Sequence, residues 1–123
     1  DHLGIWHTCG IYKVELLDEA AVHALEHGAV WVTYKPEIEK EEIINLTTML
    51  SGKSKILLSP HSEQMSPIVA TSWGRRLEIE TSNDPRLNKF VDFFMDGEAA
   101  PEAGITCGRG LGRPPNEPLV LNR

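Results

Sequence analysis

The sequence predicts an α/β (α+β) domain with a small mixed sheet flanked by about three helices. The chain has 123 residues, a length that suits one domain. Short runs of β-branched and aromatic residues alternate with stretches of helical periodicity, and this pattern predicts a parallel strand pair joined by a helix. A glycine then separates two further strand-like runs, and a hairpin at that point makes the sheet mixed.

The first third of the chain predicts a strand, a helix and a second strand. Residues 10–12, Gly-Ile-Tyr, open a short strand after an irregular arm. A helix is expected over residues 18–27, with Asp18 as its N-cap and Gly28 just past its end. Residues 29–34 are β-branched and aromatic, which favours a buried strand.

The middle of the chain predicts a helix followed by two strands. Pro36 stands where a helix accepts its first residue, and Gly52 stands where this helix ends. Its apolar stripe consists of Ile43, Leu46 and Leu50. Strands are expected at 55–59 and 68–73, on either side of a polar loop over 61–67.

After a bend at Gly74, residues 77–80 alternate apolar and acidic side chains. This alternation predicts a strand with one face exposed to solvent. The last helix has Asp84 as its N-cap, Pro85 at its first position and Gly97 at its end. This order of elements resembles the second half of a thioredoxin-like sandwich. Residues 1–100 are therefore expected to form the domain and residues 101–123 an extended tail rich in proline and glycine.

Composition excludes some classes of partner. The net charge is -6 and no basic stripe is present, which argues against binding to nucleic acid or to an anionic membrane surface. The sign of the charge suits a cationic ligand such as a metal ion. The two cysteines, Cys9 and Cys107, are compatible with one disulfide bond or with two reduced thiols.

The first expected helix contains a histidine pair. His23 and His27 are four residues apart, so their side chains share one helix face and can chelate one metal ion. Glu19 and Glu26 flank the pair, and either carboxylate is placed to orient an imidazole as a hydrogen-bond acceptor. The alternative is a pair of solvated histidines on a polar face. The same letters match the H-x-x-E-H pattern of inverted zinc peptidases, in which the glutamate activates water.

Further ligands come from elsewhere in the chain. A zinc peptidase needs a third ligand, for which Glu80 and Glu98 are candidates. His2 and Met65 suit copper, because a thioether is a soft ligand and imidazole binds both copper oxidation states. The other two histidines, in the arm and in the loop over 61–67, are His7 and His61.

Four segments in order resemble the bacterial domain-of-unknown-function family 3105. They are Gly-Ile-Tyr at 10–12, Val-His-Ala-Leu-Glu-His-Gly-Ala-Val at 22–30, Ala-Thr-Ser-Trp-Gly-Arg at 70–75 and Ala-Pro-Glu at 100–102. The resemblance implies a domain outside the cytoplasm, tethered by an N-terminal membrane anchor upstream of Asp1. It also favours a Cys9–Cys107 disulfide and marks His2, together with the pair on the helix, as the histidines of the family pattern.

The sequence therefore predicts an extracytoplasmic metal-binding domain that sequesters, delivers or senses copper, with zinc as the second choice. The predicted metal ligands are His23, His27, His2 and Met65, with Glu26 beside them. A small zinc-dependent hydrolase and a non-catalytic interaction module without metal are the alternatives, and the sequence favours binding over catalysis.

Overall fold

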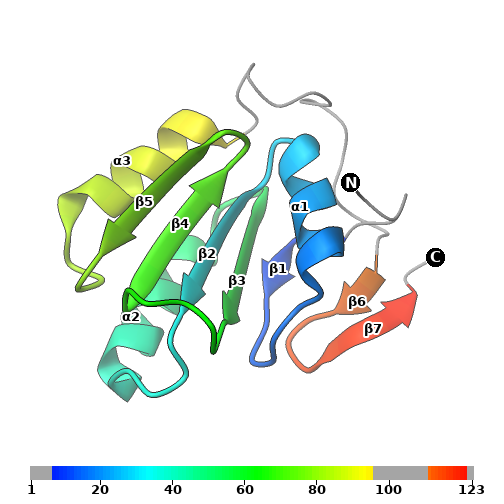
Figure 1. The fold of residues 1–123 in the computed structure, drawn as a ribbon, viewed down its shortest axis with the longest axis horizontal. Coiled ribbons are helices and arrows are strands. Elements are labelled where there is room, and N and C mark those ends of the chain that lie inside the picture. The colour runs from blue at the N-terminus through cyan, green and yellow to red at the C-terminus, as the bar shows by residue number, and fades with distance from the viewer. Residues whose placement is uncertain (1–6, 96–110, 122–123) are drawn as a thin grey trace.

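The computed structural model describes residues 7–95 and 111–121 (Figure 1). These residues form a five-stranded mixed sheet, three helices and a separate two-stranded hairpin. The sheet contains β1 (Gly10–Ile11), β2 (Val30–Tyr34), β3 (Ile56–Pro60), β4 (Ile68–Ser72) and β5 (Arg75–Ile79). The helices are α1 (Asp18–Glu26), α2 (Lys40–Leu50) and α3 (Pro85–Phe94). The predicted α/β class is confirmed.

The strand order of the sheet is β1-β3-β2-β4-β5. Strand β3 runs parallel to both β1 and β2, and α2 provides the crossover between β2 and β3. Strands β4 and β5 are antiparallel to their neighbours and form the predicted hairpin. Gly74 in this turn has φ +80°, a conformation that glycine adopts without steric cost.

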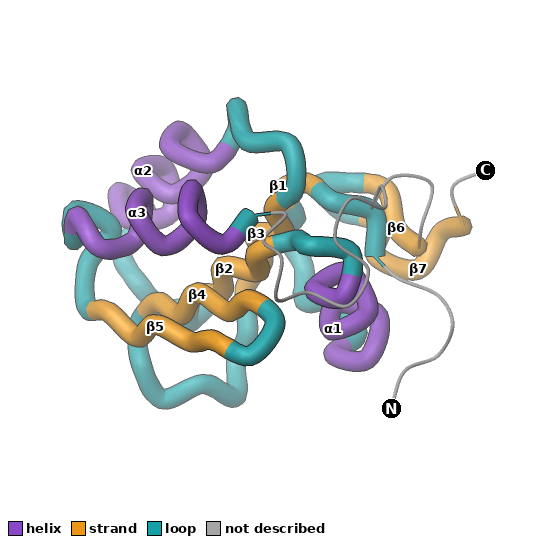
Figure 2. The backbone as a smooth tube through the Cα atoms, turned by 90° about the horizontal axis from the view of Figure 1, so that it is seen from above, coloured by secondary structure: helices purple, strands orange, loops and turns teal. Residues whose placement is uncertain are grey.

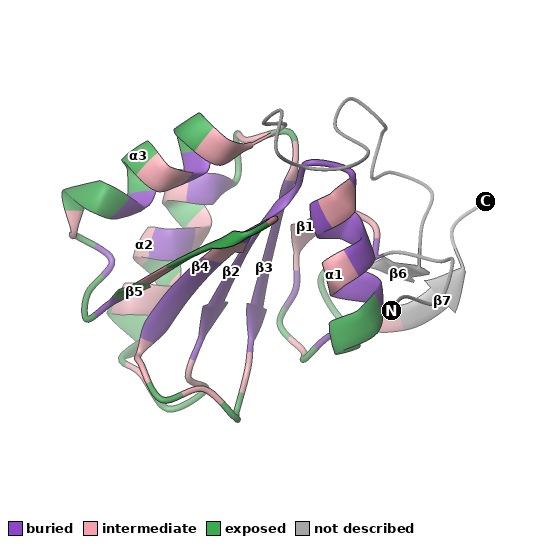
Figure 3. Ribbon diagram, turned by 45° about the horizontal axis from the view of Figure 1, so that its top comes forward, coloured by how far each residue is buried: buried purple, intermediate pink, exposed green. Residues whose placement is uncertain are grey.

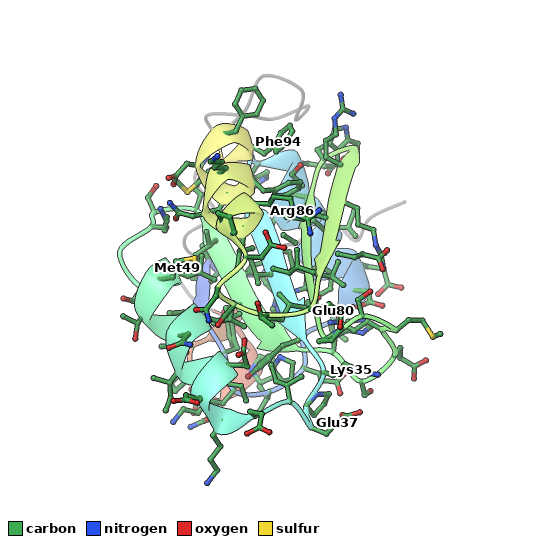
Figure 4. All side chains as sticks on the ribbon, turned by 90° about the vertical axis from the view of Figure 1, so that its left-hand side faces the viewer. Lys35, Glu37, Met49, Glu80, Arg86 and Phe94 are labelled. Carbon is green, nitrogen blue, oxygen red and sulfur yellow. The ribbon has the colours of Figure 1, made fainter. Side chains whose placement is uncertain are left out.

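The helices divide unequally between the two faces of the sheet (Figures 2 and 4). Helices α2 and α3 lie on one face, and α1 covers part of the other face near β1 and β3. Because side chains alternate along a strand, Val30, Val32 and Tyr34 join the core beneath α2 and α3, whereas Trp31 packs against α1. Every residue of β2 is buried, as expected of a central strand (Figure 3).

The main core joins the sheet to α2 and α3. Its helical side chains are Leu46 and Leu50 of α2 and Leu87 and Val91 of α3, all fully buried. A smaller cluster lies between α1 and the sheet and consists of Tyr12, Leu16, Ala21, Ala24, Leu25, Ala29, Trp31 and Leu57. The apolar periodicity in the sequence therefore placed the core stripe of α2 correctly.

Helix α2 begins later than the sequence predicts. Residues 36–39 precede the helix, and the expectation that Pro36 is its first residue is wrong. The amide of Ile38 donates to the carbonyl of Lys35 at 3.2 Å, so residues 35–38 form a turn with proline in its second position. The fixed φ of proline suits that position of a turn as well as it suits a helix start.

The start of α1 also differs from the prediction. Its N-cap is Leu17, which makes no side-chain cap bond, and Asp18 lies in the first turn. The buried ring of His7 lies at this end of the helix, where its Nε2 accepts a hydrogen bond from the Leu17 amide at 2.8 Å. His7, expected in a free arm, is therefore part of the structure that supports the helix N-terminus.

Helix α3 begins as predicted. The carboxylate of Asp84 accepts from the Arg86 amide at 3.0 Å, and Pro85 is the first helical residue. Gly97, predicted to end this helix, lies outside the described residues. Within the described ranges, no helix has both the length and the apolar character needed to cross a bilayer.

The C-terminal part of the chain, predicted as an extended tail, contains a hairpin. Its strands are β6 (Leu111–Arg113) and β7 (Glu117–Leu121), which pair antiparallel. The turn between them reaches the domain, because the Lys13 amide donates to the carbonyl of Pro115 at 2.6 Å. The hairpin lies on the β1 side of the sheet (Figure 1).

Candidate metal-binding site

The histidine pair lies near the end of α1, where a glycine closes the helix. His27 is the C-cap, and Gly28 follows with φ +99°. The Gly28 amide donates to Leu25 at 3.0 Å and the Ala29 amide donates to Ala24 at 3.1 Å. These two bonds form a Schellman motif, so the predicted role of Gly28 is confirmed. The motif holds the backbone of His27 in place and turns the chain into β2.

We expect Gly28→Ala to lower the free energy of unfolding by about 1–2 kcal/mol, because a Cβ disfavours a positive φ. Gly52 is the matched control, since its φ is not in the positive region and a Cβ there meets no heavy atom within 4 Å. Gly52→Ala is expected to leave stability unchanged or to raise it slightly. Urea denaturation of both variants measures the difference, and equal losses would contradict the role of the motif.

The structure brings the two imidazoles together. The ring centroids of His23 and His27 are 4.9 Å apart, and the rings meet edge to face at 76°. His23 is 5% exposed and His27 is 2% exposed. The pair is thus buried, which excludes the alternative of two solvated histidines on a polar face.

A carboxylate and an ammonium group lie beside the pair. Oε1 of Glu26 is 3.7 Å from Nε2 of His23, and the Glu26 side chain is 13% exposed. This separation is longer than a hydrogen bond. It is within a few tenths of an ångström of the distance, about 3.3 Å, between two ligands of one tetrahedral zinc ion. The ammonium of Lys55 donates to the carbonyl of His27 at 2.7 Å.

The other predicted ligands do not join the pair within the described residues. Met65 is 88% exposed in the loop between β3 and β4. In that loop His61 reaches Asp18, at the opposite end of α1 from His27, with 3.2 Å between Nε2 and Oδ1. His2 lies outside the described residues.

The remaining candidates are also accounted for. Glu80 is exposed just after β5, and Glu98 lies outside the described residues (Figure 4). His7 supports the start of α1, a role that the sequence did not reveal because ten residues separate His7 from Leu17. Over residues 7–95 and 111–121, no three side chains of the His, Cys, Asp or Glu type are grouped so as to hold a metal ion.

Comparison with known proteins identifies the chain. Residues 1–109 match the family described as protein of unknown function (DUF3105). The chain belongs to this family. No curated protein and no solved structure matched the chain. The likeness to a thioredoxin-like sandwich therefore stays a prediction, and the DUF3105 description assigns no activity that could be transferred.

Proposed function

We propose that this domain binds a transition-metal ion outside the cytoplasm, with copper as the first choice and zinc as the second. The observation that carries the proposal is the pair of imidazoles from His23 and His27. His23 lies in α1 and His27 is the C-cap of that helix, and their ring centroids are 4.9 Å apart in a buried position. Two imidazoles fixed in this way lose little conformational entropy when they bind one ion.

The donor set guides the choice of metal. Imidazole binds copper and zinc, and at a site of nitrogen and oxygen ligands copper(II) binds more tightly than zinc(II). Glu26 lies close enough to His23 either to orient the ring or to bind the ion. Two imidazoles and one carboxylate leave a fourth position, for which His2 is the proposed ligand. Met65, which is 88% exposed in the loop between β3 and β4, is left out of this set.

The burial of the pair favours binding over hydrolysis. A catalytic zinc keeps one coordination position open to water and substrate. His23 and His27 are at most 5% exposed, so a bound ion would be shielded from large substrates. Sequestration or delivery of the ion therefore suits the site better than the H-x-x-E-H hydrolase reaction with Glu26 as base.

The proposed location outside the cytoplasm rests on the family resemblance and on the cysteines. None of the described residues is a free cysteine, and Cys9 is the one cysteine among them. The other cysteine of the chain is Cys107, which lies outside the described residues. A Cys9–Cys107 bond, which we propose, suits an oxidising compartment. Attachment to a membrane through an upstream anchor is part of the same proposal.

The decisive measurement is metal content by mass spectrometry, on protein purified without a histidine tag. We expect near-stoichiometric copper or zinc in the parent chain, and its loss in the His23→Gln/His27→Gln double variant. His61→Gln is the matched control, because His61 lies at the other end of α1 and is expected to leave the metal in place.

A second measurement detects metal binding without relying on the fold of the double variant. Added copper or zinc should raise the melting temperature of the parent and of His61→Gln, because a ligand that binds only the folded state stabilises it. If the parent contains no metal and takes up none from excess copper(I), copper(II) or zinc(II), the proposal is wrong. The remaining hypothesis is then the non-catalytic interaction module. Peptidase activity lost in Glu26→Gln with the metal retained would favour the hydrolase.

A further inference from the structure

A small cavity lies on the sheet face that α1 leaves partly open. Helix α1 covers this face near β1 and β3, and the loop between β3 and β4 runs beside the remainder (Figure 2). The cavity has a volume of about 180 Å³ and is lined by residues of β2, β4, β5 and that loop. It adjoins His61, which contacts the first turn of α1, so it is separate from the pair at the helix end.

Two opposite charges line this cavity. Arg76 projects from β5, and Glu63 belongs to the loop. Nε of Arg76 donates to Oε2 of Glu78 at 3.1 Å, which leaves the two Nη atoms of the guanidinium for a ligand. The hydroxyl of Ser66 also donates to Glu78; this bond and the charge of Arg76 lower the pKa of that carboxyl, so Glu78 remains an anion. Within the described ranges, neither the Nη atoms of Arg76 nor the Glu63 carboxylate has a partner.

The other walls supply an aromatic surface and hydroxyl groups. The Trp31 indole donates to Oγ of Ser59 at 3.0 Å, which fixes the ring. The ring of His61 meets the indole edge to face, with centroids 5.8 Å apart. Nδ1 of His61 accepts a hydrogen bond from the backbone amide of Glu63 at 3.3 Å, which links the loop residue that supplies the carboxylate to the imidazole. Thr71 adds a hydroxyl from β4.

We propose that this cavity binds a free α-amino acid as its zwitterion. The ligand carboxylate pairs with Arg76, the ligand ammonium pairs with Glu63, and the ligand side chain lies on Trp31. Guanidinium groups bind carboxylates through two parallel hydrogen bonds. A simple anion would be repelled by Glu63, and a simple cation would leave the Nη atoms of Arg76 without a partner.

The size of the cavity limits the ligand. Sites for drug-sized molecules measure about 300–1,000 Å³, so about 180 Å³ suits a smaller molecule. A peptide suits the site less well than a free amino acid, because a peptide separates its two charged ends along the chain.

Isothermal titration calorimetry with alanine, valine and leucine tests this site. N-acetylvaline lacks the ammonium and valinamide lacks the carboxylate, so each should bind at least about tenfold more weakly than valine. Arg76→Gln should weaken valine binding by a similar factor. Arg75→Gln is its matched control, because Arg75 is the adjacent exposed residue of β5 and does not line the cavity.

The acidic side of the cavity has its own control. Glu63→Gln should weaken valine binding, whereas Glu80→Gln, an exposed residue outside the cavity, should not. Binding should persist in the presence of a metal chelator, which separates this site from the proposed metal site. The proposal is overturned if none of the three amino acids binds, if N-acetylvaline and valinamide bind as tightly as valine, or if Arg75→Gln has the effect expected of Arg76→Gln.

Discussion

The double variant Cys9→Ala/Cys107→Ala is expected to lower the free energy of unfolding by about 4–5 kcal/mol. A bond between these residues would close a loop of nearly the whole domain, and the entropy that such a bond removes from the unfolded chain grows with loop length. Cys9 is half-buried against the cluster beneath α1, beside β1. The proposed bond would therefore tie the segment after α3 to this edge of the sheet.

Urea denaturation under oxidising conditions measures this loss. Adding a reductant should lower the stability of the parent to that of the double variant and leave the double variant unchanged. Thiol labelling of the unfolded, unreduced parent should modify no cysteine. Labelling of both cysteines, or equal stability of parent and variant without reductant, would show that the bond does not form and would weaken the proposed location outside the cytoplasm.

Leu46→Ala is expected to lower the free energy of unfolding by about 2–5 kcal/mol. Leu46 of α2 is fully buried in the main core. The substitution removes buried methyl groups and leaves a cavity that α2 and the sheet can close only in part. Because small domains are stable by about 5–15 kcal/mol, this loss would lower the melting temperature by many degrees.

Ile44→Ala is the matched control on the same helix. Ile44 is 60% exposed, and alanine favours the helix more than isoleucine does. We expect its effect to stay within about 0.5 kcal/mol. Thermal and urea unfolding of the two variants test the position of α2, and a larger loss in Ile44→Ala than in Leu46→Ala would contradict it.

Local sequence patterns predicted the structure correctly where it depends on residues within one segment. The run of β-branched residues predicted β2, and the apolar spacing predicted the buried stripe of α2. Asp84 and Pro85 predicted the start of α3 because a cap acts within one turn of the helix. Gly28 predicted the end of α1 for the same reason. The four-residue spacing of His23 and His27 alone predicted that their rings would meet.

Other features depend on residues that only the fold brings together. His7 reaches Leu17 across ten residues of chain, and no local pattern predicts that contact. Pro36 has the same fixed φ in a turn as in a helix start, so the sequence alone could not separate the two. The sequence left open a pair of solvated histidines on a polar helix face, yet both side chains are buried by their surroundings in the folded domain.

The cavity shows most clearly what the fold adds. Trp31, Glu63 and Arg76 lie on three different segments, and none of them belongs to a motif. They meet because the strand order places β4 beside β2 and because the loop after β3 returns alongside the open face. The class of the domain, most of its elements and its histidine pair follow from neighbours along the chain, so local patterns were enough to predict them. Which charges face one another depends on strand order and packing, and therefore became visible only in the folded domain.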